Sequence, residues 1–228
     1  EVVLPEGEGC CGAIVHHMGR ERQGLGLARH NIGVWTREIE GEGLDAILVT
    51  ASGCGTAIKD YGHAFRLRPA TAGKAAKVSS LVLDITEYRA RLDLPPSSRS
   101  TDLVVAYHSA CSLQHGQKVA REPKELLSKF GFVVKDIPEG HLCCGSAGTY
   151  NILQPALAER LRNRKVANIE TLQPDVIAAG NIGCITQIGA GTAIPVVHTV
   201  ELLDWATGGP VPEPLAEIVG ATPAAAAS

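Results

Sequence analysis

Cysteines in a repeated arrangement are the residues of this chain whose type and spacing could do chemistry. Of the seven cysteines, six fall into two sets, each a Cys-Cys-Gly triplet followed further along by a Gly-Cys pair. Clustered thiolates select zinc, Cu(I) or iron–sulfur clusters. A single cysteine is often only a small buried apolar residue, but a patterned set of six argues against that role. The candidate metal ligands are Cys10, Cys11, Cys54, Cys111, Cys143, Cys144 and Cys184.

The spacing of the two sets indicates an internal duplication. Between the adjacent pair and the single cysteine lie 42 residues in the first copy, which ends at Cys54, and 39 in the second, which ends at Cys184. In each copy an aspartate, Asp45 or Asp175, stands nine residues before that cysteine and opens an apolar run. Both aspartates are expected to be turn or cap residues. The chain is therefore predicted to contain two copies of one module.

Apolar runs that alternate with helical patterns must position these cysteines. In the second copy we expect strands at 102–108, 132–136 and 175–184, and helices at 118–130 and 155–172. In the first copy we expect a helix at 25–39, a strand at 45–54 and a connecting helix at 75–91. Strands and helices that alternate at this length are typical of parallel βα units. The expected fold class is α/β, with two similar, Rossmann-like cysteine-rich βα modules that have parallel sheets.

The module boundaries follow from composition. A stretch rich in proline and serine at 95–100 separates the copies, so the first module is expected at 1–94 and the second at 101–206. Residues 207–228 are rich in Gly, Pro and Ala and are predicted to be a disordered tail. The opening strand, helix and cysteine of the second copy have no counterpart after Glu1. We therefore expect the first module to be truncated at its N-terminus and the chain to be a fragment.

Four cysteines of the second copy are expected to meet at one sheet edge. Cys111, the Cys143–Cys144 pair and Cys184 each follow a predicted strand, and parallel strands end at a shared edge where ligands gather. Neighbours on an extended strand point to opposite sides, so the adjacent pair needs a tight turn, which Gly145 permits. The nearby glycines favour a bulky cluster over a lone zinc ion. The sequence thus predicts a thiolate metal site, iron–sulfur and redox-active, with zinc as the alternative.

Two histidines, His108 and His141, flank this set of four cysteines. They could donate hydrogen bonds to a cluster, take part in proton transfer or replace a missing ligand. The commoner role of such residues is that of an ordinary core or surface histidine. The lysine and arginines at 160–165 are interpreted as a solvated helix face.

Composition and charge exclude several classes of function. The net charge of −3 offers no electrostatic footprint for nucleic acid. No apolar run has the roughly 18–20 residues that a membrane-spanning helix needs. An odd number of cysteines without a secretion signal fits a reducing compartment. The expected location is the cytoplasm, with a peripheral position at the inner face of the cytoplasmic membrane as a further option.

Four sequence stretches resemble a known family. They are ASGCGTAIKDYGH (51–63), SLQHGQKV (112–119), HLCCGSAGTY (141–150) and NIGCITQ (181–187). The spacing of Cys111, Cys143, Cys144 and Cys184 is similar to that of the cysteine-rich CCG domain, which occurs in heterodisulfide reductase and lactate-utilisation proteins. The stretches themselves resemble the glycolate oxidase iron–sulfur subunits. The resemblance covers about residues 2–205.

The resemblance implies an iron–sulfur electron-transfer subunit of a glycolate (2-hydroxyacid) dehydrogenase complex. Such a subunit takes electrons from an FAD-containing subunit and passes them toward a membrane quinone. The implied cofactor is an iron–sulfur cluster of the 4Fe-4S type, and the implied class is an oxidoreductase acting on CH–OH groups, with no activity expected of the fragment alone. The family commonly has Cys-Pro-Cys where this chain has Ser109-Ala110-Cys111. Cys111 is then the sole thiolate of that segment.

Two other functions remain open at this point. One is a structural zinc-binding module that docks subunits and does no redox work. The other is a thiol–disulfide enzyme like heterodisulfide reductase, which would turn over a disulfide substrate and be inhibited by alkylation of its thiols.

Overall fold

The computed structural model describes residues 1–92, 97 and 102–220. Contacts within the chain divide it into two compact units, Glu1–Asp84 and Ile85–Ser228. The division falls earlier than the expected module end at residue 94, because helix α6 (Ile85–Ala90) packs against helix α7 (Glu122–Lys129) of the second unit. The expected linker at 95–100 lies, apart from Ser97, outside the described residues.

The second unit is built on a four-stranded parallel sheet. Its strands are β3 (Val104–His108), β4 (Val133–Asp136), β5 (Val176–Ala179) and β6 (Val196–His198), in the order β4-β3-β5-β6. The central strand β5 is buried along its whole length, as expected of a parallel strand with helices on both faces. Asp175 accepts a hydrogen bond from the backbone N–H of Val104 at 2.7 Å, which ties the start of β5 to β3.

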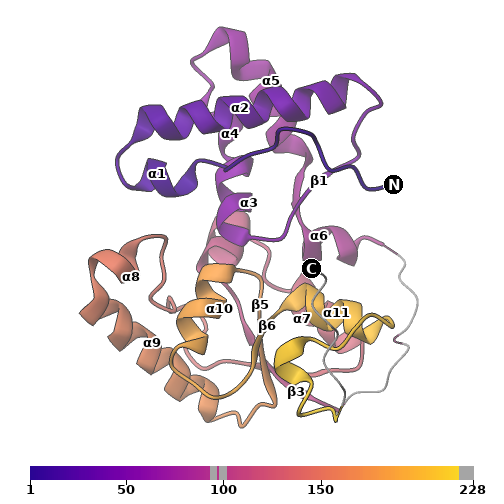
Figure 1. Ribbon diagram of the computed structural model, residues 1–228, viewed down its shortest axis with the longest axis vertical. Helices are drawn as coiled ribbons and strands as arrows, with labels where there is room; N and C mark the ends of the chain where they lie inside the picture. The colour runs from indigo at the N-terminus through magenta and orange to yellow at the C-terminus, as the bar shows by residue number, and fades with distance from the viewer. Residues whose placement is uncertain (93–96, 98–101, 221–228) are drawn as a thin grey trace. The chain divides into compact units, whose positions relative to one another are not determined.

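Helices cover both faces of this sheet (Figure 1). One face packs against α7 and α11 (Thr199–Ala206), and the other against α9 (Pro155–Glu170) and α10 (Ile182–Gly189). The remaining elements are a π-helical turn, η1 (Ser112–Gln117), a short helix, α8 (Tyr150–Leu153), and a 3₁₀ turn, η2 (Glu213–Leu215).

The pleat of β3 sorts its side chains between the two faces. Val105 and Tyr107 belong to the apolar cluster with α7 and α11, whereas Ala106 belongs to the cluster with α9 and α10. Side chains alternate along a strand, so His108 shares the face of Ala106. That face also holds Cys144 and Cys184.

The first unit has a smaller parallel sheet. Strands β1 (Ile47–Val49) and β2 (Val82–Asp84) pair with each other, and Val49 lies opposite Asp84 much as Ala179 lies opposite His198 in the second unit. The helices are α1 (Ala13–His17), α2 (Glu21–Glu40), α3 (Ser52–Lys59), α4 (Tyr61–Ala64) and α5 (Pro69–Leu81). Their buried side chains form one core cluster with those of the sheet.

The structure confirms the α/β class with parallel sheets and corrects several local expectations. The strands expected at 45–54 and 175–184 end at Val49 and Ala179, because helices α3 and α10 begin soon after them and contain the single cysteines. The helix expected at 75–91 is interrupted by β2, because Val82 is buried in the core and its strand pairs with β1. The helix expected from residue 118 begins at Glu122, since Lys118 has a left-handed backbone with φ of 63°. Strand β6 and helix α11 were not expected.

The expectation of a disordered tail from residue 207 is wrong for residues 207–220. Leu215 is fully buried in the cluster formed by α7, α11 and the sheet, so burial of apolar surface holds this segment in place. Residues 221–228 lie outside the described chain. Among the helices that the structure describes, none is both long and apolar enough to cross a membrane.

Candidate metal centre

The adjacent cysteines of the second unit sit on a tight corner between β4 and α8. Gly145 has a left-handed backbone with φ of 95°, and a Cβ atom there would lie 2.3 Å from the carbonyl oxygen of Ala158 on α9. Its backbone N–H donates to Cys143 Sγ at 3.3 Å. The sequence prediction of a glycine-dependent turn is confirmed, and the close approach of α9 explains why no side chain fits there.

The other two cysteines reach the corner from neighbouring strands. Cys111 follows β3 and precedes η1, while Cys184 lies in the first turn of α10, just after β5. Asn181 caps that helix by accepting a hydrogen bond from the backbone N–H of Cys184 at 3.3 Å. Because β4, β3 and β5 are adjacent and parallel, the segments that follow them meet at one edge of the sheet.

Hydrogen bonds join the four thiols into one contiguous group. Those donated by Cys111 and then Cys144 lower the pKa of Cys143 to about 2, and one from Cys144 lowers the pKa of Cys184 to about 5. The same bonds, together with burial, raise the pKa of the thiols of Cys111 and Cys144. The four sulfurs thus share their protons, and a metal that binds all four must displace the protons that remain.

His108 adds an imidazole to this group. One of its ring nitrogens and the Sγ atoms of Cys144 and Cys184 all lie within 4.8 Å of one another, and the three residues are buried. Among the described residues this is the one such set of potential metal ligands. The other flanking histidine, His141, is exposed to solvent.

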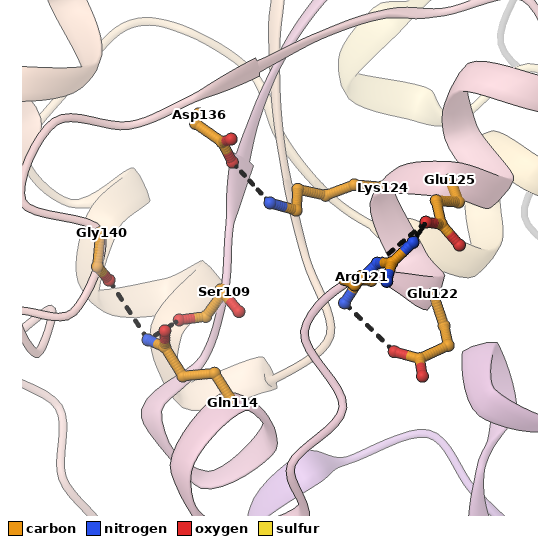
Figure 2. A network of polar contacts seen from close by, with 8 residues as sticks. All are labelled: Ser109, Gln114, Arg121, Glu122, Lys124, Glu125, Asp136 and Gly140. Carbon is orange, nitrogen blue, oxygen red and sulfur yellow. Dashed lines mark hydrogen bonds and ion pairs between the residues drawn. The ribbon is translucent and has the colours of Figure 1, made fainter.

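A glutamine connects two of the cysteine-bearing loops, as Figure 2 shows. Gln114 Nε2 donates to the carbonyl oxygens of Ser109 at 2.9 Å and Gly140 at 3.2 Å. The first carbonyl precedes Cys111 and the second precedes Cys143, so the side chain fixes the two loops to each other. Nothing in the local pattern of the sequence pointed to this role.

A buried lysine lies behind the corner. Lys165 on α9 is only 1% exposed, and its Nζ donates to the carbonyl oxygen of Glu139 at 3.1 Å. Burial lowers its pKa, and the nearby sulfur groups of Cys144 and Cys143 oppose that shift. The interpretation of 160–165 as a solvated face is therefore wrong at this residue. The signal was its position on the buried stripe of α9 between Ala158 and Ile169.

The first unit repeats the corner with fewer donors. Gly12 has φ of 84°, a Cβ atom there would lie 2.6 Å from the carbonyl oxygen of Gly24 on α2, and its N–H donates to Cys10 Sγ at 3.5 Å. Cys54 lies in the first turn of α3, and a hydrogen bond from Cys11 lowers its pKa to about 7. The structure therefore brings these three predicted ligands together, although Cys10 remains exposed.

Uncharged side chains fix the backbone around the adjacent cysteines of the first unit. The side chain of Asn31 on α2 accepts from the N–H of Gly9 at 2.9 Å and donates to its carbonyl at 2.8 Å. The hydroxyl of Tyr61 donates to the carbonyl oxygen of Cys11 at 2.7 Å. In this way the segment that carries the adjacent cysteines is fixed on both sides by buried polar side chains.

The donor sets suit a thiophilic metal centre. Soft thiolates with an imidazole match iron–sulfur clusters and zinc, and they do not match calcium or magnesium, which prefer oxygen ligands. In the second unit every donor already lies at the sheet edge, with glycine backbone close by. The residues present therefore fit either of the metal centres expected from the sequence.

Comparison with known proteins places these observations in a family. The model of the cysteine-rich domain CCG matches residues 1–59 and 105–189, one segment in each unit. The glycolate oxidase iron-sulfur subunit of Escherichia coli (strain K12) is 40% identical over 205 residues, which are 90% of this chain and 50% of that protein. A probable glycolate oxidase iron-sulfur subunit of Bacillus subtilis (strain 168) is 29% identical over 218 residues, 91% of this chain and 48% of that protein.

A shorter relative is covered more completely. Lactate utilization protein A of Bacillus licheniformis is 26% identical over 211 residues, which are 90% of this chain and 86% of that protein. The chain spans about half the length of the two glycolate oxidase subunits that it matches. The duplicated Cys-Cys-Gly corners and the two matched segments together show that the chain belongs to the CCG family of cysteine-rich domains.

Proposed function

We propose that this chain is an electron-transfer part of a 2-hydroxyacid dehydrogenase complex, with glycolate as the substrate of the complex. The observation that carries the proposal is the contiguous group of four thiols at the sheet edge of the second unit. The relatives named as iron-sulfur subunits of glycolate oxidase support the identity of the metal centre and of the complex.

In this proposal the four cysteines of the second unit hold an iron–sulfur cluster of the 4Fe-4S type. When bound, the cluster supplies a one-electron acceptor and donor. The chain's own residues position and tune it: Gly145 lets the backbone approach, Gln114 fixes two of the ligand loops, and Lys165 offsets negative charge. Three thiols of the first unit, those of Cys10, Cys11 and Cys54, are proposed as ligands of a second centre.

The partner that fits this role is an FAD-containing subunit that oxidises the hydroxyacid. Electrons would leave one at a time through the thiolate-bound centre toward a membrane quinone. In this proposal the flavin of the partner subunit accepts the electron pair of the substrate, so the chain alone is not expected to oxidise glycolate. The proposed location is the cytoplasm, with contact to the membrane made through the complex.

Anaerobic reconstitution tests the metal centre. The purified chain is incubated with iron and sulfide, desalted, and analysed for iron, acid-labile sulfide and zinc per chain. We expect iron and sulfide in similar amounts, broad visible absorption, and an electron paramagnetic resonance signal after reduction. A colourless protein that holds stoichiometric zinc under the same conditions would instead establish the structural zinc module.

The zinc alternative has one specific observation in its favour. His108, Cys144 and Cys184 form a compact set of the kind that zinc binds. Co-purification with the flavin subunit separates the two functions, since addition of glycolate to that complex should bleach the visible absorption of an electron-transfer centre. A zinc module would leave the spectrum of this chain unchanged.

A further inference from the structure

The imidazole of His108 is buried beside cysteine sulfurs, with no oxygen or nitrogen partner among the described residues. The residue is 2% exposed, and neither Nδ1 nor Nε2 has a nitrogen or oxygen partner in the part of the chain that the structure describes; the polar group that the ring contacts is the sulfur of Cys184. Buried polar atoms nearly always have a partner, because leaving them unpaired is costly. A buried imidazole whose polar neighbours are cysteine sulfurs therefore indicates that a group outside the polypeptide, bound by the same sulfurs, completes its coordination.

The surroundings of His108 show what that group is. The pleat of β3 turns the side chain to the face that holds Cys144 and Cys184, and one ring nitrogen lies within 4.8 Å of both Sγ atoms. Metal ions sit about 2.3 Å from thiolate sulfur and about 2.0–2.1 Å from imidazole nitrogen. Ligand atoms around one ion are then somewhat closer than 4.8 Å, a gap that small side-chain movements close.

We propose that His108 is a ligand of the metal centre in the second unit, so that this centre has a mixed imidazole–thiolate donor set. The inference rests on the proposed function only in requiring that a metal centre forms there. It assigns Cys144, Cys184 and His108 to one side of the site. Cys111 and Cys143, whose thiols contact each other, lie on the other side.

A mixed donor set has a consequence for the redox properties. A neutral imidazole brings no charge, whereas a thiolate brings one negative charge, so a centre with an imidazole ligand is easier to reduce. The same effect raises the potential of Rieske centres, in which two histidines replace two cysteines on one iron. The centre of the second unit should therefore have a higher reduction potential than the same centre with a thiolate in place of the imidazole.

Nitrogen hyperfine spectroscopy tests the assignment directly. The full chain is produced with ¹⁵N-labelled histidine, reconstituted anaerobically with iron and sulfide, reduced, and studied by pulsed electron paramagnetic resonance. We expect a strong coupling to one histidine nitrogen, which is lost in His108→Ala and kept in His141→Ala. The second variant is the matched control, because His141 flanks the same cysteines but is exposed.

A second variant guards against loss of folding. His108→Cys supplies a thiolate in place of the imidazole, and we expect it to keep its iron, to lose the nitrogen coupling and to have a lower reduction potential than the parent chain. If the chain takes up zinc instead of iron, X-ray absorption of the zinc form replaces the resonance experiment. One nitrogen should then be present in the zinc shell of the parent and absent from that of His108→Cys.

The outcomes separate the two proposals. A parent chain that binds iron and sulfide but shows no strong histidine coupling overturns the ligand assignment and leaves the proposed function intact. A zinc form with a histidine nitrogen in its shell supports the assignment and overturns the electron-transfer function. A chain that binds neither metal overturns both.

Discussion

Both units place a glycine with a left-handed backbone against a helix: Gly12 meets Gly24 in the first, and Gly145 meets Ala158 in the second. In each, the glycine N–H donates to the sulfur of the first cysteine of the pair. The corner is thus the same. Its surroundings differ, because the first unit contributes three thiols, whereas the second contributes four thiols and a buried imidazole.

The residue behind each corner sharpens this contrast. Asn31 and Lys165 lie at corresponding places, about two helical turns beyond Gly24 and Ala158, and each is 1% exposed. Both contact backbone carbonyls of the loop before the cysteine pair. One is an amide that cannot be charged, and the other is an amine that can carry a positive charge. The two units therefore share this packing but differ in the residue next to the site, so we expect the two proposed centres to differ in affinity and potential.

The largest expected difference between the units is in metal binding. Cys144→Ser removes the sulfur that contacts both Cys143 and Cys184, so we expect this variant to lose most of the iron of the second centre. The matched variant Cys11→Ser, in the unit with three thiols, should lose much less. The loss in each variant is measured as the iron and sulfide bound per chain after anaerobic reconstitution. Equal losses would show that the two centres are equivalent.

The two corners should respond alike to an added methyl group. Gly12→Ala and Gly145→Ala each force a side chain onto a left-handed backbone and against a helix carbonyl. We expect each to lower the free energy of unfolding by about 1–3 kcal/mol, or more where the helix cannot move. Chemical denaturation of each variant and of the parent chain measures this change in the free energy of unfolding. Gly148→Ala is the control, because φ is 68° there but a Cβ atom would meet nothing within 4 Å. A control variant that loses as much stability would show that the helix contact has no role.

The charge of Lys165 should influence the reduction potential of the metal centre proposed at the second corner. In Lys165→Met the buried cation beside the anionic centre is lost, so the reduced form is less stabilised and the midpoint potential should fall. Arg160→Met removes a charge from an exposed position of the same helix, where solvent screens it, and should change the potential little. Redox titration of both variants makes the comparison. Equal shifts would mean that the burial of Lys165 is irrelevant.

The smallest expected effect belongs to the first unit. Tyr61→Phe removes the hydrogen bond to the carbonyl oxygen of Cys11, which should cost about 1 kcal/mol of stability. Burial raises the pKa of the Tyr61 hydroxyl above its ordinary value of 10. The unfolded chain therefore loses this proton first, and the stability of the first unit should decline as the pH rises above about 10. Denaturation at pH 7 and above pH 10 checks both effects, and a decline that persists in Tyr61→Phe would assign it to another group.

Much of the second site followed from local pattern. The rule that parallel strands end at one edge placed Cys111, Cys143, Cys144 and Cys184 together, and Gly145 marked the turn between strand and helix. The roles of Gln114 and Lys165 did not follow. Gln114 bonds to loops after two different strands, and Lys165 is buried by a loop far away in sequence. The helical stripe of α9 could have indicated that Lys165 is buried, but the segments that these two side chains contact depend on the tertiary structure.

By itself the sequence determined the kinds of donor, their repeated spacing and the parallel α/β architecture, because these depend on residue type and on the periodicity of apolar residues. The tertiary structure decided which donors share a site. The strand order β4-β3-β5-β6 and the pleat of β3 bring His108 beside Cys144 and Cys184. Strand order is set by packing between distant segments, and it is this packing that turns one imidazole toward the cysteine sulfurs at the sheet edge.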